Sequence, residues 1–280
     1  MGLRQLMSKR ALGWLSWRRK RQYHHSQRTL EATTEAVMAL TPDAIVLTGD
    51  LLHIGLREEM RQIRPWLQRL SEQVPVMLVP GNHDLYAPDS LAHWQQELGD
   101  LNVFGDNSKQ NIAGNIWPRL LKVNQVKIVG LSSAYPAPLT RADGQLGATQ
   151  RARLARWLKE HSIDDAALLL ALHHPATHRL AKPRKNLLDA QELQDLLQQN
   201  PHKVTALVHG HLHQNLSYQV ANTPCYCTAS ASSNQVTAPA SFRLLEFNDN
   251  HFTSRLYVGD FGDSNTDPVF NERPDSQNPA

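Results

Sequence analysis

Side chains able to bind metal ions follow four of the apolar segments of this sequence, at the point where each segment ends. They lie in Gly49-Asp50, Gly81-Asn82-His83-Asp84, His173-His174-Pro175 and Gly210-His211-Leu212-His213. Because ligands bind outside the carboxyl ends of the strands in an open α/β sheet, we expect these side chains to converge on one volume. One such motif alone is commonly just a turn, whereas four in order at strand ends indicate a metal or catalytic site.

The donor atoms of this set narrow the choice of metal. Asp50, Asn82, His173 and His211 offer a mixture of nitrogen and oxygen ligands, which suits Mn, Fe or Zn better than Ca. An Asp that uses both carboxylate oxygens is also a natural bridge between two ions in a paired site. The pattern therefore predicts a transition-metal site.

The ordered series Gly-Asp, Gly-Asn-His-Asp, His-His-Pro and Gly-His-Leu-His resembles the calcineurin-like metallophosphoesterases over about residues 43–235. Within that superfamily it is most similar to the bacterial class III cyclic-nucleotide phosphodiesterase and glycerophosphodiesterase branch. The resemblance implies a four-layer α-β-β-α sandwich of two mixed β-sheets flanked by helices. It also implies metal-dependent hydrolysis of a phosphodiester or pyrophosphate bond in a phosphorylated small molecule.

The resemblance also assigns roles to the metal-binding side chains, position by position. It implies that Asp50 bridges two divalent ions and that His213 binds the first of them. Asn82, His173 and His211 would complete the site of the second ion. Paired cations stabilise the charge that grows on the attacking and leaving oxygens of a phosphodiester, and a metal lowers the pKa of a bound water.

Two further residues receive catalytic roles from the resemblance. His83 would stand beside the scissile phosphate as general acid or electrostatic stabiliser, and Asp84 would orient it. A His paired with a carboxylate keeps one tautomer and a raised pKa, which suits proton donation to the leaving oxygen.

One motif of the family has no counterpart here. The family opens with a strand that ends in Asp-x-His, and nothing before Asp50 matches it. We therefore expect the first metal site to keep only Asp50 and His213, and the chain to hold one ion. We expect the natural reading frame to begin upstream of Met1, with a truncated or degenerate homologue as the alternative. The same departure leaves open a protein that binds one metal or a phosphorylated ligand without turnover.

The segments that position these motifs alternate between strand and helix patterns, which is typical of an α/β fold with a largely parallel sheet. The predicted strands are Asp43–Thr48, Val74–Val79, Val126–Leu131, Ala167–Leu172 and Val204–Val208. The predicted helices are Gln27–Leu40, Glu58–Glu72, Ser90–Leu98, Thr149–Glu160 and Ala190–Gln199. Later short strands predict a second, antiparallel-leaning sheet; they are Leu216–Val220, Pro224–Ala229, Phe242–Phe247 and His251–Tyr257.

Composition is that of a globular protein, with 41% hydrophobic and 20% charged residues. We predict one domain over residues 1–260 and a disordered tail over residues 261–280, which is rich in Pro, Asn and Asp. The only cysteines, Cys225 and Cys227, lie two residues apart and exclude a disulfide framework, so a cytoplasmic location is expected.

The N-terminus is strongly basic, because residues 1–30 hold eight Lys or Arg and no Asp or Glu. Residues 1–25 also carry Trp14 and Trp17, so this segment is a candidate for peripheral contact with an anionic membrane. A solvated face is the alternative. Such contact would suit a second substrate class, a lipid-linked nucleotide of the UDP-diacylglucosamine type. No specific nucleic acid partner is predicted.

Overall fold

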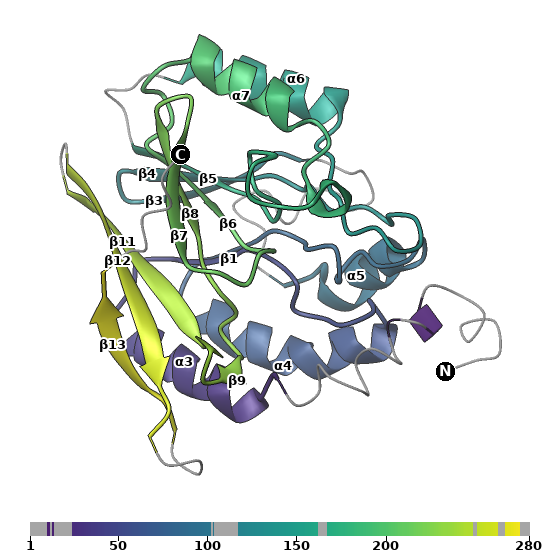
Figure 1. Cartoon of the computed structure of the whole chain (residues 1–280), viewed down its shortest axis with the longest axis vertical. Coiled ribbons are helices and arrows are strands. Elements are labelled where there is room, and N and C mark those ends of the chain that lie inside the picture. Colours follow the sequence, from purple (N-terminus) through teal and green to yellow (C-terminus); the bar gives the residue numbers. More distant parts are fainter. Residues whose placement is uncertain are drawn as a thin grey trace.

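A computed structural model of the chain describes residues 10, 11, 13, 24–101, 103, 117–161, 167–248, 251–262 and 267–274. Its elements form four layers, with helices on the two outer sides and strands between them (Figure 1). Within the described residues, no helix combines the length and the apolar character needed to cross a bilayer.

The larger sheet has six strands in the order β3-β4-β5-β6-β8-β7. Its four central strands run parallel, and an antiparallel strand closes each edge. The strands are β3 (Arg119–Val123), β4 (Val126–Gly130), β5 (Ala167–Ala171), β6 (Ala206–His209), β7 (Leu216–Val220) and β8 (Thr223–Cys227).

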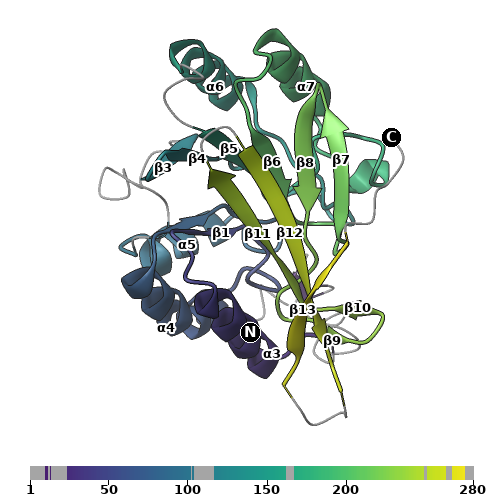
Figure 2. The same ribbon diagram turned by 90° about the vertical axis from the view of Figure 1, so that its left-hand side faces the viewer.

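The second strand layer consists of smaller sheets. Strands β1 and β2 form a parallel pair, and β11, β12 and β13 form an antiparallel sheet. Figure 2 shows β11 and β12 lying over β6 and β8 of the larger sheet. The bounds are β1 (Ile45–Leu47), β2 (Val76–Leu78), β9 (Asn234–Gln235), β10 (Ala238–Pro239), β11 (Ser241–Asn248), β12 (His251–Asp260) and β13 (Val269–Arg273).

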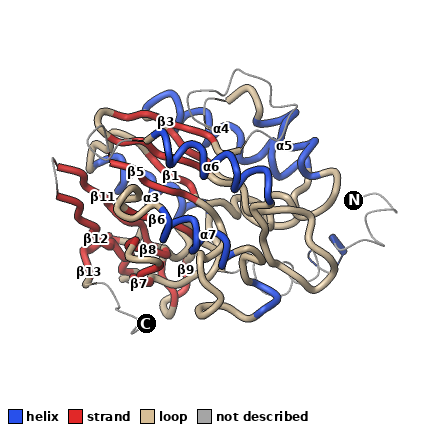
Figure 3. The backbone as a smooth tube through the Cα atoms, turned by 90° about the horizontal axis from the view of Figure 1, so that it is seen from above, coloured by secondary structure: helices blue, strands red, loops and turns tan. Residues whose placement is uncertain are grey.

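Helices cover both outer faces. Helices α6 (Ala148–Glu160) and α7 (Ala190–Gln199) lie over the larger sheet, as the view from above shows (Figure 3). The opposite side carries α3 (Gln27–Ala39), α4 (Arg57–Gln73) and α5 (Ser90–Leu98). A short 3₁₀ turn, η2 (Pro183–Lys185), precedes α7.

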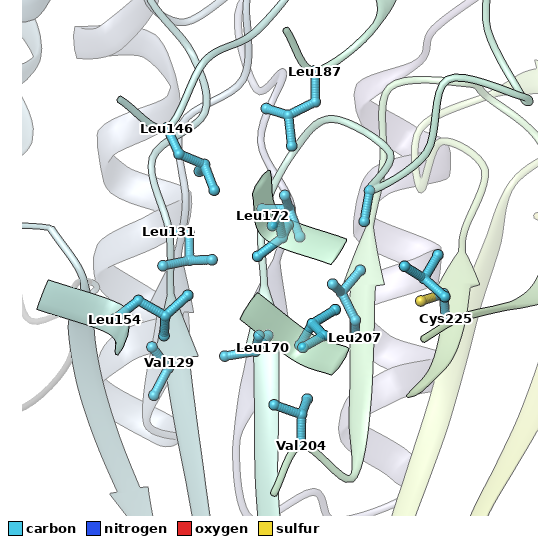
Figure 4. Close-up of a cluster of buried hydrophobic side chains, with 14 of the residues drawn as sticks. Val129, Leu131, Leu146, Leu154, Leu170, Leu172, Leu187, Val204, Leu207 and Cys225 are labelled. Carbon is cyan, nitrogen blue, oxygen red and sulfur yellow. The ribbon is translucent and has the colours of Figure 1, made fainter. Parts of the chain in front are cut away.

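The alternation of side chains along β5 explains why this strand is apolar throughout. Leu168 and Leu170 pack with residues of α6 and α7 in a cluster shown in Figure 4, whereas Leu169 and Ala171 pack with the second strand layer. Successive side chains of a strand point to opposite faces, so a strand covered on both sides must be apolar at every position. The burial pattern of β5 is that of a central strand between two layers.

The β2 strand has the same alternation in the other layer. Val76 and Leu78 pack with residues of α4 and α5, and Met77 and Val79 pack with the larger sheet. Three apolar clusters therefore join four layers. The predicted α-β-β-α fold is confirmed.

Two expectations about the later strands need correction. Strands β7 and β8 join the larger sheet, where β8 pairs with β6, whereas β11 to β13 form a separate antiparallel sheet. The tail was predicted to be disordered from residue 261, but Val269–Arg273 forms β13. The edge of β12 supplies backbone partners for this segment, and the Phe270 ring packs 5.3 Å, centre to centre, from that of Phe242.

Of the basic N-terminal segment, only residues 10, 11, 13, 24 and 25 are described, so the predicted membrane contact lies mostly outside the described residues. Arg10 is buried and donates hydrogen bonds to the carbonyl oxygens of Ile54 (3.0 Å) and Gly55 (2.8 Å). It also forms an ion pair with Asp89 at 2.8 Å. At this residue the basic segment is part of the fold rather than a solvated face.

Candidate metal centre

Two glycines let the ends of β1 and β2 meet. Gly49 has a φ of +89°, a left-handed conformation that glycine adopts at little cost. A Cβ atom on Gly49 would overlap the backbone of Gly81, and one on Gly81 would overlap the carboxylate of Asp50. These close approaches bring Asp50 and Asn82 to the same edge of the second strand layer.

The ends of β5 and β6 face this edge from the larger sheet. The Nδ1 atom of His173 lies 2.7 Å from the carbonyl oxygen of Thr48, which connects the loop after β5 to the loop after β1. Because β5 and β6 are parallel neighbours, His173 and His211 follow them at the same edge. The four strand ends therefore converge, as the sequence predicts.

The Nε2 atom of His173 is the centre of this arrangement. It lies 3.2 Å from Oδ1 of Asn82, 3.1 Å from Nδ1 of His211 and 3.3 Å from Oδ2 of Asp50. We call these four residues (Asp50, Asn82, His173 and His211) the four-donor cluster. Asn82, His173 and His211 are each more than nine-tenths buried.

The donor set fits a divalent transition metal. Since the carbonyl of Thr48 accepts the hydrogen of His173 Nδ1, the Nε2 atom of neutral His173 carries a lone pair. That lone pair faces two oxygen acceptors, and a metal ion or a proton among these atoms removes their mutual repulsion. Ligands about 2.0–2.2 Å from one ion are roughly 3.0–3.5 Å from each other. The observed separations lie in this range.

The charges of these groups depend on one another. Burial opposes ionisation of Asp50, but the charges of His173 and then His83 hold its pKa well below the usual range. Burial likewise opposes protonation of His173, but the negative charge of Asp50 raises its pKa overall. Burial is also the main cause of the strongly lowered pKa of His211. A neutral His211 keeps a nitrogen lone pair for a metal.

His174 lies next to the four-donor cluster, and it forms with His173 and His211 a group whose ring nitrogens are all within 4.8 Å of one another. Both nitrogens of His174 have partners, however. Nδ1 lies 2.8 Å from the Ser133 hydroxyl and Nε2 lies 3.3 Å from the Ala142 carbonyl. In contrast, Nε2 of His211 is buried without a hydrogen-bond partner in the described part of the chain. His174 therefore supports the cluster through packing.

His213 is placed differently from the other predicted ligands. Its side chain is exposed, and its ring lies 6.2 Å, centre to centre, from the ring of His25. His25 in turn lies 6.2 Å from His53. His25 and His53 do not belong to any of the four motifs recognised in the sequence. Each lies outside the regular helices and strands, and only the fold brings them near His213. His213 also lines a depression of about 350 Å³ with residues 214–216, 229 and 237–239.

His83 is held against the cluster through its backbone and its ring. Its N–H donates to Oδ1 of Asp50 at 2.8 Å, and its Nδ1 lies 2.6 Å from the carbonyl oxygen of His53. The ring stacks on that of Tyr86, with 5.6 Å between centres. Because the His53 carbonyl fixes the hydrogen on Nδ1, the Nε2 atom is the one that can exchange a proton.

That Asp84 orients the His83 ring stays a prediction, and the carboxylate of Asp84 also has backbone partners. The Asp84 carboxylate is fully buried and accepts hydrogen bonds from the backbone N–H groups of Asp50 (2.8 Å), Leu52 (3.0 Å) and Gly81 (2.8 Å). Burial and, next, the charge of Asp50 raise its pKa to about 7, while the N–H donors act in the opposite direction. Asp84 therefore holds the two turns together, and the carbonyl of His53 contacts the His83 ring.

The backbone is strained where the candidate ligands lie. Asp50, His211 and His213 have φ values of 60°, 69° and 54°, in the left-handed region that residues other than glycine rarely adopt. Such conformations cost about 1–3 kcal/mol each and cluster at functional sites.

The layers and the cluster define an α-β-β-α protein with a candidate metal centre at the carboxyl ends of its strands. The family model described as calcineurin-like phosphoesterase matches residues 20–215, and the chain belongs to this family.

Two curated relatives cover a large part of the chain. A protein of Arcobacter nitrofigilis described as a probable glycerophosphodiester phosphodiesterase is 28% identical over 70% of this chain, and this chain covers 65% of its length. A probable cyclic nucleotide phosphodiesterase of Synechococcus sp. is 27% identical over 78% of this chain and 77% of its own length.

A dimetal phosphatase from Danio rerio has the same fold, with a TM-score of 0.59, covering 88% of this chain and 90% of that one. At 13% identity, this likeness concerns the fold alone.

Proposed function

We propose that this chain hydrolyses a phosphodiester or pyrophosphate bond with divalent transition metal ions, either Mn, Fe or Zn. The metal ligands would be Asp50, Asn82, His173, His211 and His213. The observation that carries the proposal is the position of His173 Nε2, which lies 3.1–3.3 Å from three other donor atoms. When bound, the metal supplies Lewis-acid stabilisation of the phosphoryl oxygens and a water of lowered pKa.

We assign the proton transfer of this reaction to His83. Its Nε2 atom would give a proton to the leaving oxygen, because its Nδ1 atom is committed to the carbonyl of His53. The stacked ring of Tyr86 and the hydrogen bond from its backbone N–H to Asp50 hold His83 in place for this transfer. The protonated ring also stabilises negative charge on the phosphate if the leaving group needs no proton.

The substrate class is supported by the relatives. Both are described as phosphodiesterases, one acting on glycerophosphodiesters and the other on cyclic nucleotides. A phosphodiester in a small molecule is therefore the substrate that we propose for this chain.

Removal and return of metal tests the proposal directly. Dialysis against a chelator is expected to abolish hydrolysis of bis-p-nitrophenyl phosphate, and addition of Mn²⁺, Fe²⁺ or Zn²⁺ is expected to restore it. The measurements are the release of p-nitrophenolate and the metal content by elemental analysis. Hydrolysis that persists in the metal-free protein would refute the proposal. Metal binding without turnover would favour the non-catalytic alternative.

Replacement of His83 by Gln separates proton transfer from metal binding. Because His83 does not belong to the four-donor cluster, His83→Gln should keep its metal content. Its rate on a substrate with a poor leaving group should fall about 10²–10⁴-fold, the usual contribution of general acid catalysis. The loss should be smaller with bis-p-nitrophenyl phosphate, whose leaving group needs little protonation. An equal loss on both substrates, together with loss of metal, would contradict this role.

A further inference from the structure

A buried arginine from the basic N-terminal segment joins the loop after β1 to the loop after β2. The guanidinium of Arg10 donates hydrogen bonds to the carbonyl oxygens of Ile54 (3.0 Å) and Gly55 (2.8 Å) in the first loop. It also pairs with both carboxylate oxygens of Asp89, each at 2.8 Å, and donates to the Ser90 hydroxyl at 3.0 Å. Arg10 therefore holds the first loop against the end of the second, where α5 begins.

The same two loops supply two contacts of the His83 ring. The carbonyl oxygen of His53, the residue before Ile54, lies 2.6 Å from Nδ1 of His83. Tyr86, three residues before Asp89, stacks on the His83 ring with 5.6 Å between ring centres. The orientation of this ring therefore depends on how the two loops lie relative to each other.

Gly13 packs against both loops as well, at a point separate from the guanidinium of Arg10. A Cβ atom on Gly13 would lie 2.6 Å from the side chain of Ile54 and 2.7 Å from the hydroxyl oxygen of Tyr86. Both distances are shorter than real Cβ contacts, so a side chain at this position would displace Ile54 or Tyr86. The N-terminal segment thus approaches the contacts of His83 at two places.

We propose that Arg10 is a positioning residue for His83 and acts on it through the His53 carbonyl and the Tyr86 ring. The inference rests on the proposed function, because His83 is the proton donor assigned there. A proton donor is effective only when it lies within hydrogen-bond reach of the leaving oxygen, and a shift of about 1 Å can cost about 10²-fold in rate.

The contacts of Arg10 require a guanidinium. A guanidinium is a planar fork that binds a carboxylate through two parallel hydrogen bonds and still has a donor for another acceptor, whereas the ammonium of Lys is a compact point charge. A buried charge is costly unless it is paired and hydrogen-bonded. Asp89 provides the pairing, and the hydrogen bond from Arg10 is the main cause of its lowered pKa. The pair therefore stays charged at neutral pH.

The metal ligands on the same two loops have a separate support. The buried carboxylate of Asp84 accepts the N–H groups of Asp50 and Gly81 and so joins the turns where these loops begin. Loss of Arg10 should therefore disturb the His83 ring more than it disturbs the four-donor cluster.

Rates of the metal-loaded full chain on two diesters test this inference. Diphenyl phosphate lacks the nitro groups of bis-p-nitrophenyl phosphate, so its leaving oxygen depends much more on a proton donor. Arg10→Ala is expected to lose about 10²-fold in rate on diphenyl phosphate, far less on bis-p-nitrophenyl phosphate, and no metal by elemental analysis. Arg69→Ala, at an exposed position of α4, is the control and should match the wild type on both substrates.

Two further variants and a rescue experiment separate positioning from a merely structural role. Arg10→Lys should show the same selective loss, because it lacks the planar fork. Gly13→Ala should show it as well, because the added methyl group displaces Ile54 or Tyr86. Guanidinium ions, at concentrations far below those that unfold proteins, should restore part of the diphenyl phosphate rate of Arg10→Ala, and ammonium ions should not.

The possible failures are distinct. Equal losses on both diesters in Arg10→Ala, or a wild-type ratio of the two rates, would overturn the inference. A selective loss in His83→Gln without one in Arg10→Ala would overturn the inference alone and leave the proposed function intact. A wild-type ratio in His83→Gln would overturn the proton donor of the proposed function itself. If the thermal midpoint shows that Arg10→Ala does not fold, the ratio of the two rates in Gly13→Ala decides the outcome.

Discussion

Replacing Asp50 by Ala is expected to lower the rate of phosphodiester hydrolysis by at least about 10³-fold, because a bound metal supplies several kcal/mol of transition-state stabilisation and each 1.36 kcal/mol is a factor of ten. The change removes the oxygen that faces His173 at 3.3 Å and the oxygen that accepts the N–H of His83. Metal retained after dialysis should fall in parallel. The measurements are initial rates and elemental analysis.

Two replacements of Asp50 allow a graded comparison of metal content. Asp50→Asn keeps the size and one oxygen but loses the charge, so its metal content should lie between those of wild type and Asp50→Ala. Asp195→Ala, at an exposed position of α7, is the matched control and should behave as the wild type. If Asp50→Ala keeps full metal content and rate, the ion is held elsewhere and the four-donor cluster is not the site.

The layered fold follows from the sequence wherever a strand is covered on both faces. The run Ala-Leu-Leu-Leu-Ala of β5 is apolar at every position because both faces are buried, and this makes it easy to recognise. Strand β3 lies at an edge and has Arg119 and Lys122 among its five residues, so its pattern is weak. Strand β13 has only two apolar residues, Val269 and Phe270, and depends on the edge of β12.

The convergence of the four-donor cluster was predictable for a related reason. Asp50, Asn82, His173 and His211 each follow a recognisable parallel strand, and the carboxyl ends of such strands meet at one edge. His25 has no such signal. Its position depends on Ser232, which lies 207 residues away along the chain, and no local pattern predicts a contact of that length. The role of Asp84 was also hidden, because its neighbour in sequence is His83 but its hydrogen-bond partners are three backbone groups.

The second large effect is expected on the free energy of unfolding when Asp84 is replaced by Ala. Asp84→Ala would leave the N–H groups of Asp50, Leu52 and Gly81 without their acceptor in a fully buried position. A buried donor without a partner costs about 1–3 kcal/mol. We therefore expect the free energy of unfolding to fall by about 3–5 kcal/mol, below the simple sum because neighbouring losses are not additive.

Urea unfolding followed by circular dichroism measures this change, and two variants sharpen it. Asp84→Asn keeps one acceptor oxygen but turns a donor toward the backbone N–H groups, so it should also be destabilised. Asp43→Ala, at an exposed position before β1, should stay within about 0.5 kcal/mol of the wild type, as surface changes usually do. Since the turns that Asp84 joins carry Asp50 and Asn82, metal content should fall together with stability. Wild-type stability and metal content in Asp84→Ala, with only the rate reduced, would instead support the catalytic role that the family resemblance implies.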